Sequence, residues 1–210
     1  MRIGLDFGTT HTSAAIYDGH QLKLIPLDAK SRDPYLLRSL IYITREQDVS
    51  VGTEAAERYL KDNTGRPVKY EWKYVGTIEN VFSQDDWEPL IMIRDVYVVQ
   101  DVGAPGRLIQ SVKTGLRDKY YTGTNIYGKF YKIQDLIAII LSYVKERAEA
   151  YLGSKVTEVV LGHPVKFSED PTTHMYAMQR LREAAQQAGF NNIAFEQEPI
   201  AAALFYTSKV

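Results

Sequence analysis

The residues best suited to chemistry lie near the N-terminus, where Asp6, Gly8, Thr9 and Thr10 follow an apolar run. A phosphate group needs backbone N–H donors that can approach it closely, so a glycine suits such a turn and small hydroxylated residues add donors. A carboxylate does not bind phosphate directly, but it can hold the water shell of Mg²⁺. The turn therefore has the chemistry of half a magnesium–phosphate cradle, and a plain polar turn between strands is the alternative.

Three other segments carry groups that could complete such a site. Lys113, within RLIQSVKTGL (107–116), could reach a terminal phosphate as a point charge, although a solvated lysine is the commoner case. Pro164 makes a stiff corner after an apolar run, where ligands gather in α/β sheets, or it simply ends a strand. Glu198 stands at the mouth of an apolar helix, where the dipole favours a carboxylate, or it belongs to a capped core helix.

The elements that must position these groups follow from hydrophobic periodicity and turn residues. Strands are expected over 2–7, 12–17, 21–25, 39–44, 49–52, 156–161 and 193–195, and helices over 53–61, 134–152 and 173–188. Thr53 is expected as the N-cap of the first helix, and Pro199 opens a short apolar helix near the end. Residues 62–107, with many glycines and prolines, predict irregular structure with one strand over 96–100. This order indicates a mixed α/β fold.

Composition narrows the classes of function. The 210 residues are 45% hydrophobic and 24% charged, with a net charge of −1, so no basic field argues for nucleic acid. The absence of cysteine excludes disulfides and thiol catalysis and is compatible with a reducing cytoplasm. The longest aliphatic run, 136–141, is far too short to span a membrane. The four histidines have no metal-ligand spacing on one helix.

Taken together and in order, five segments resemble motifs of the actin-like ATPase superfamily, and within it the DnaK-type seventy-kilodalton heat-shock chaperones. The segments are Ile3–Thr10, Ser39–Thr44 with Val51-Gly52, Ser111–Lys113, Gly162–Phe167 with Gln179-Arg180, and Gln197–Tyr206. The long stretch between Gly52 and Lys113, and the His163-Pro164-Val165 step, resemble the divergent YegD-like branch.

The resemblance implies ATP or ADP with Mg²⁺ as cofactors, and it assigns roles to the catalytic residues. Lys113 is implied to position the attacking water near the γ-phosphate. Asp6 and Glu198 are implied to hold the metal through water and to help order that water.

The same resemblance assigns the binding and switching residues. Gly8, Thr9, Thr10 and the amide of His11 are implied to cradle the β- and γ-phosphates. Pro164 and Arg180 are implied to pass the nucleotide state to a substrate-binding domain, although several extra residues separate them here.

The implied fold is an actin-like, ribonuclease H-like lobe. Its base subdomain is expected from residues 1–38 and 116–210, and an inserted α/β subdomain carrying Lys113 from 39–115. The implied partners are a client protein and a co-chaperone in a cytoplasmic setting, with no nucleic acid and no membrane. Because the chain stops soon after Tyr206, before the family's second phosphate loop, this lobe alone is expected to be inactive. A sugar kinase and a filament-forming ATPase of the same superfamily are the alternatives.

Overall fold

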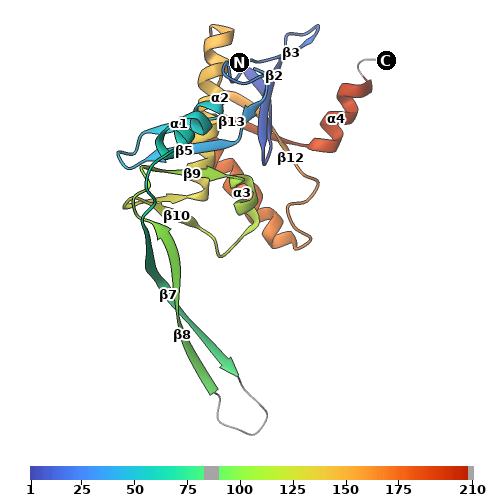
Figure 1. The fold of residues 1–210 in the computed structure, drawn as a ribbon. Coiled ribbons are helices and arrows are strands. Elements are labelled where there is room, and N and C mark those ends of the chain that lie inside the picture. Colours follow the sequence, from blue (N-terminus) through green and yellow to red (C-terminus); the bar gives the residue numbers. More distant parts are fainter. Residues whose placement is uncertain (83–89, 208–210) are drawn as a thin grey trace. The chain divides into compact units, whose positions relative to one another are not determined.

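The apolar runs near both ends of the chain become strands of one sheet. The computed structural model describes residues 1–82 and 90–207, and its main sheet has the strand order β13-β12-β1-β2-β3, with β4 paired to β2 (Figure 1). The strands are β1 (Arg2–Phe7), β2 (His11–Tyr17), β3 (Leu22–Leu24), β4 (Leu37–Arg38), β12 (Glu158–His163) and β13 (Asn192–Gln197). Three of them, β1, β12 and β13, run parallel, so their carboxyl ends share one edge of the sheet.

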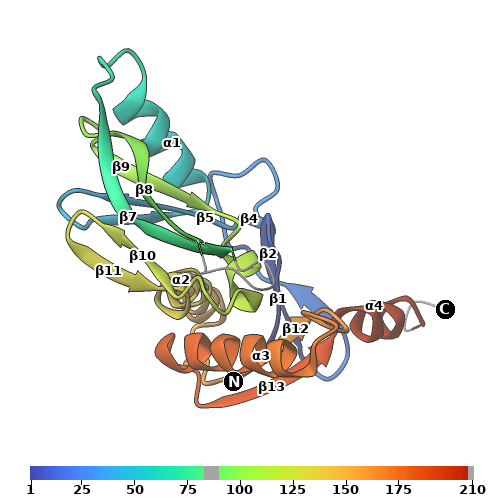
Figure 2. The same cartoon turned by 90° about the horizontal axis from the view of Figure 1, so that it is seen from below.

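Two long helices complete the core. They are α2 (Ile133–Leu152) and α3 (Pro171–Gln187), which contact each other; in Figure 2, α2 is seen nearly end-on beside α3. Their apolar stripes join the sheet in a single cluster of buried side chains, including Ile3, Leu5, Ile137, Leu141 and Leu181. Gly153 ends α2 in the left-handed conformation that glycine adopts without strain. No helix in the part of the chain described is long and apolar enough to cross a membrane.

Smaller elements surround this core. A three-stranded sheet has the order β6-β5-β9, and a separate hairpin joins β10 to β11. Their bounds, with the remaining helices, are β5 (Leu40–Thr44), β6 (Val49–Val51), α1 (Thr53–Asn63), β9 (Gly106–Gln110), the 3₁₀ helix η1 (Val112–Arg117), β10 (Gly123–Ile126), β11 (Lys129–Lys132) and α4 (Glu198–Thr207).

The chain divides into two compact units. One comprises residues 1–61 and 106–210, and the other comprises residues 62–105. Lys113 therefore belongs to the same unit as Asp6 and Glu198. The predicted division into a base and an insertion, at 38/39 and 115/116, stays a prediction.

The second unit overturns one expectation. Residues 62–107 were predicted to be irregular apart from 96–100, whereas β7 (Tyr70–Phe82) and β8 (Leu90–Asp101) form a long antiparallel ribbon (Figure 1). The part of the prediction that falls on residues 83–89 lies outside the described residues. The glycines and prolines of the segment are concentrated where the ribbon begins and ends, and Gly76 accompanies a bulge within β7.

The predicted cap of α1 is also wrong. Thr53 is the first residue of the helix, and its hydroxyl has no hydrogen-bond partner among the described residues. The Asp28 carboxylate caps the helix instead, since its Oδ2 accepts a hydrogen bond of 2.8 Å from the Thr53 backbone N–H. The other predicted helices and strands are confirmed to within about two residues, the usual uncertainty of element ends.

Candidate functional site

The turn between β1 and β2 is shaped by one glycine. Phe7 pairs with Thr12 across the two strands, so the chain reverses within residues 8–11. A Cβ atom at Gly8 would collide with the His11 carbonyl oxygen, so no other residue fits this turn without a backbone shift. Thr9, Thr10 and His11 are exposed there, where their amides and hydroxyls can meet a ligand.

A residue that the sequence analysis did not single out braces this turn. Ser39 is buried, its Oγ donates to the Gly8 carbonyl at 2.9 Å, and its backbone N–H donates to the Thr10 carbonyl at 2.9 Å. The hydroxyl of Thr12, also buried, lies 3.0 Å from Ser39 Oγ. In the sequence, Ser39 directly precedes the apolar run of β5. Such a position predicts a buried hydroxyl, and a buried hydroxyl needs a hydrogen-bond partner.

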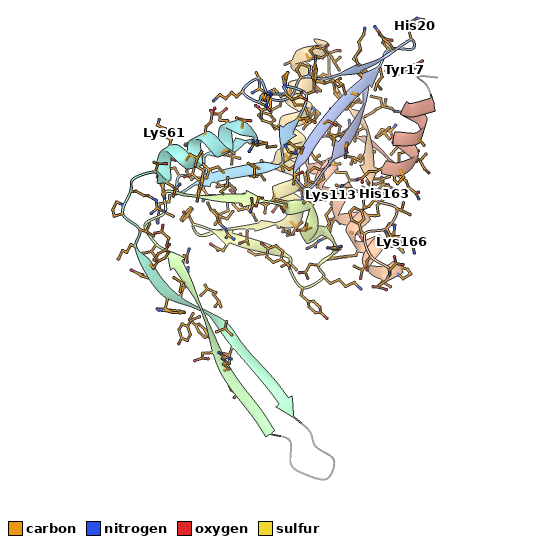
Figure 3. The ribbon with its side chains drawn as sticks, turned by 45° about the vertical axis from the view of Figure 1, so that its right-hand side comes forward. Tyr17, His20, Lys61, Lys113, His163 and Lys166 are labelled. Carbon is orange, nitrogen blue, oxygen red and sulfur yellow. The ribbon has the colours of Figure 1, made fainter. Side chains whose placement is uncertain are left out.

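Lys113 and Glu198 meet although they are far apart in sequence. Lys113 Nζ donates to Glu198 Oε1 at 2.8 Å, and the lysine side chain is only 10% exposed. The lysine nitrogen also lies 6.0 Å from the centre of the Phe7 ring, which ends β1. Lys113, labelled in Figure 3, extends from η1, which follows Ser111 in a left-handed conformation.

Asp6 adds a second carboxylate to this pair. Partial desolvation, followed by the charge of Glu198, raises the pKa of Asp6 above its ordinary value, while the Lys113 charge acts in the opposite direction. Two carboxylates thus share one ammonium group, which leaves the cluster with an excess of negative charge. Gly162 on β12 borders the cluster, since a Cβ there would be in ordinary van der Waals contact with Glu198 Cγ at 3.4 Å and Asp6 Cα at 3.8 Å.

The sheet explains why these residues converge. Asp6 lies near the carboxyl end of β1, and Glu198 begins α4 directly after the end of β13. Because β1, β12 and β13 are parallel, their ends meet at the same edge, where α/β proteins bind ligands. The structure therefore brings together Asp6, Lys113 and Glu198, three residues singled out from the sequence.

Arg180 holds the segment that carries the lysine. Its side chain is buried, and its guanidinium donates to the backbone carbonyls at and beyond the end of η1. These acceptors are the carbonyls of Gly115 at 2.9 Å, Leu116 at 3.3 Å, Asp118 at 3.1 Å and Tyr121 at 3.1 Å. A cation at the carbonyl end of a helix is electrostatically favoured, so Arg180 ties α3 to η1.

Pro164 lies directly after β12, beside a small aromatic cluster. The ring of His163, also labelled in Figure 3, contacts the Pro164 carbonyl at 2.7 Å through Nδ1. It stacks on Phe167 and meets the edge of Phe195. The corner that Pro164 makes is therefore packed against the end of β13.

The charges and shape of the site suit Mg²⁺ and phosphate. No group of three or more metal-ligating side chains occurs among the described residues. Magnesium needs only one or two carboxylates, because it retains waters and takes further ligands from phosphates. Asp6 and Glu198 are such a pair, and the turn at Gly8 has the close-approach geometry that a phosphate needs.

The fold and the site define the class of protein: the mixed α/β architecture is that of an actin-like ATPase lobe. A model of the Hsp70 protein family matches residues 99–209, which is more than half of the chain. The chain therefore belongs to the Hsp70 family, whose general role is that of an ATP-binding chaperone. The matched segment contains Lys113, Pro164, Arg180 and Glu198.

Proposed function

We propose that this chain supplies one wall of a nucleotide site that binds Mg²⁺ with ATP or ADP and hydrolyses ATP, as part of a DnaK-like chaperone. The single observation that carries the proposal is the cluster of Asp6, Lys113 and Glu198 beside the glycine turn. Its excess negative charge suits a divalent cation, and the adjacent amides suit the phosphates that such a cation accompanies.

The residues divide the work as follows. The exposed amides and hydroxyls of Thr9, Thr10 and His11 bind the β- and γ-phosphate oxygens. Asp6 and Glu198 would hold Mg²⁺ through its bound waters, and the ion would supply positive charge against the phosphates. Lys113 holds the attacking water and offsets charge that develops on the γ-phosphate. In the absence of ligand, Glu198 keeps the ammonium group of Lys113 in place.

Coupling to client binding is assigned to Pro164 and Arg180. Arg180 supports this assignment through four carbonyl contacts with the segment that begins with η1, so a shift of α3 moves the backbone that carries Lys113. Pro164 opens the segment that leads into α3. We also propose that the chaperone binds a client protein and a co-chaperone and that it works in the cytoplasm.

Equilibrium binding tests the site directly. The chain is titrated with ATP with and without Mg²⁺, and pyrophosphate is then used as a competitor. We expect weak, saturable, Mg²⁺-dependent binding that pyrophosphate displaces, because the described groups contact phosphate and metal rather than the base. Binding that is indifferent to Mg²⁺ and to pyrophosphate would rule out the proposed site. ADP formation that a hexose stimulates would instead assign the sugar-kinase alternative.

A further inference from the structure

The β7–β8 ribbon has one aromatic face and one mixed face. Side chains alternate along a strand, and directly paired residues share a face, so Trp72 lies with Val99 and Tyr74 lies with Tyr97. The aromatic face also carries Tyr70 and, farther along β8, Ile93. The opposite face is mixed, since its described residues in the paired segments include Glu71, Lys73, Arg94, Val96, Val98 and Gln100.

The apolar groups of the aromatic face are open to solvent. Trp72 is 73% exposed, Tyr70 is 68% exposed and Ile93 is 64% exposed, and the other three members of the face are about half exposed. Two strands alone are at best marginally stable in water, and a contiguous apolar face on them marks an interaction site. The family match begins at residue 99, so most of the ribbon lies outside the matched segment.

Polar groups on the aromatic face are already satisfied within the ribbon. Asp101 is ion-paired with Arg66, which lowers the pKa of Asp101 below its ordinary value. Asp95 accepts a hydrogen bond of 2.9 Å from the Thr77 hydroxyl, which also bonds to the Tyr74 hydroxyl. The face therefore offers a partner mainly rings and aliphatic groups, with the Asp95 carboxylate as a charge among them.

This composition selects the kind of partner. Within β7 and β8 the ribbon carries two basic residues, Lys73 and Arg94, against four acidic residues, Glu71, Glu79, Asp95 and Asp101. Binding of nucleic acid needs a positive groove beside the aromatic rings, so this charge disfavours that partner. A face whose exposed groups are mainly rings and aliphatic side chains is complementary to another face of the same kind, which a second copy of the same ribbon supplies.

We propose that the aromatic face of the ribbon is a homodimer interface, in which two copies pack face to face about a two-fold axis. An aromatic side chain buries about 150–250 Å², so the exposed parts of the four rings offer roughly 500 Å² on each copy. Two copies thus bury roughly 1,000 Å² before Ile93 and Val99 are added, which reaches the minimum of about 1,000 Å² for a specific interface. The pairing creates a four-stranded, two-layered sheet with its rings inside.

Two adjacent valines provide a matched test. Val99 is on the aromatic face and is 51% exposed, whereas Val98 is on the opposite face and is 44% exposed. Val99→Glu places a charge within the interface, while Val98→Glu places the same charge beside Lys73, outside it. Sedimentation equilibrium of the chain over a range of concentrations measures the dimer dissociation constant of each variant.

We expect a dimer for the unchanged chain and for Val98→Glu, with dissociation constants within about threefold, and at least about a tenfold weakening for Val99→Glu. Trp72→Ala, which removes area without adding charge, must weaken the dimer as well. Far-UV circular dichroism with thermal melting checks that each variant is folded. A monomer at every concentration, an open-ended assembly, or equal behaviour of Val98→Glu and Val99→Glu in folded protein would overturn the proposal. Binding of an unfolded polypeptide to the monomeric protein would also overturn the proposal.

Discussion

Two of the lysine–glutamate ion pairs have the same nitrogen–oxygen distance but opposite electrostatic surroundings. Lys113 Nζ lies 2.8 Å from Glu198 Oε1, and Lys145 Nζ lies 2.8 Å from Glu149 Oε1. The second pair joins successive turns of α2, and Glu149 also accepts a hydrogen bond of 2.9 Å from the Val156 backbone N–H. Its acceptors are thus engaged by the protein itself, which lowers the pKa of Glu149 to about 2.

The first pair is left electrostatically open. Burial and the charge of Glu198 destabilise the negative charge of Asp6 beside this pair, whereas the protein stabilises the charge of Glu149. A structural ion pair and a binding site therefore cannot be distinguished by the distance between two atoms. The carboxylates differ in the direction of their pKa shifts: burial and the charge of Glu198 raise that of Asp6, whereas the hydrogen bonds from Lys145 and the Val156 amide lower that of Glu149.

The largest expected difference between the pairs concerns ATP turnover. Lys113→Ala removes the cation at the proposed reaction site, and loss of one such group costs about 10²–10³-fold in rate. Lys145→Ala removes a lysine with the same pairing distance on α2, away from the phosphate turn, and we expect turnover within about threefold of the unchanged protein. Single-turnover hydrolysis compares them in protein that carries both lobes of the ATPase domain, at a temperature well below the melting temperature. Equal rates for the two variants would remove Lys113 from the mechanism.

The next effect concerns the metal. Asp6→Ala and Glu198→Ala each remove one of the two carboxylates proposed to act through metal-bound water. Loss of such an outer partner typically weakens metal affinity by about 10–100-fold. We expect the Mg²⁺ concentration needed for half-maximal ATP binding to rise by this factor, while binding of metal-free ATP changes little. Equal losses with and without Mg²⁺ would indicate a folding defect instead.

The sequence was informative where local chemistry and fold coincide. The apolar strands, the turn at Gly8 and the convergence of Lys113 with Glu198 were all expected, the last through family motifs rather than residue chemistry. The serine beside an apolar run indicated only that Ser39 would need a hydrogen-bond partner, and nothing local indicated that Arg180 would hold the carbonyls around η1. Those contacts link segments far apart in the chain, so their geometry depends on the finished fold.

The ribbon was missed for a different reason. Tyr70, Trp72 and Tyr74 alternate with Glu71 and Lys73, which is the period-two pattern of a strand. The glycines and prolines around it predict irregular structure and obscure that pattern. The local periodicity predicts the observed strands correctly, and the glycines and prolines lie mainly at the ends of the ribbon.

A smaller effect tests the closed pair through stability. Glu149→Gln removes the charge that Lys145 and the Val156 amide stabilise, and we expect a loss of about 1 kcal/mol, or about 2–4 °C in Tm, at neutral pH. Because the folded-state pKa is lowered, this stability is present above the ordinary value of 4.5 and is lost as the pH falls toward about 2. Denaturant unfolding at pH 7 and pH 3 should show that the free energies of unfolding of Glu149→Gln and the unchanged protein become more similar at the lower pH. A difference independent of pH would point to packing.

The smallest effect has the opposite sign and tests the open pair. The pKa of Asp6 is raised, so the folded state binds a proton there more tightly than the unfolded state does. Stability therefore falls as the pH rises from the ordinary value of 3.8 through the raised pKa, and it stays lower at neutral pH. Asp6→Asn removes this cost, and we expect a gain of about 0.5 kcal/mol, or about 1–2 °C in Tm, accompanied by loss of Mg²⁺-dependent binding.

Asp18→Asn is the matched control for this change. Asp18 accepts hydrogen bonds from Lys23 and from two backbone N–H groups, and these lower its pKa. The same substitution should therefore reduce the melting temperature at position 18 and raise it at position 6. Because both substitutions replace a carboxylate by an amide of equal size, the difference in sign isolates the charge. If Asp6→Asn also lowers the melting temperature, the Asp6 charge is stabilised by the protein, and the contrast between an open and a closed pair is lost.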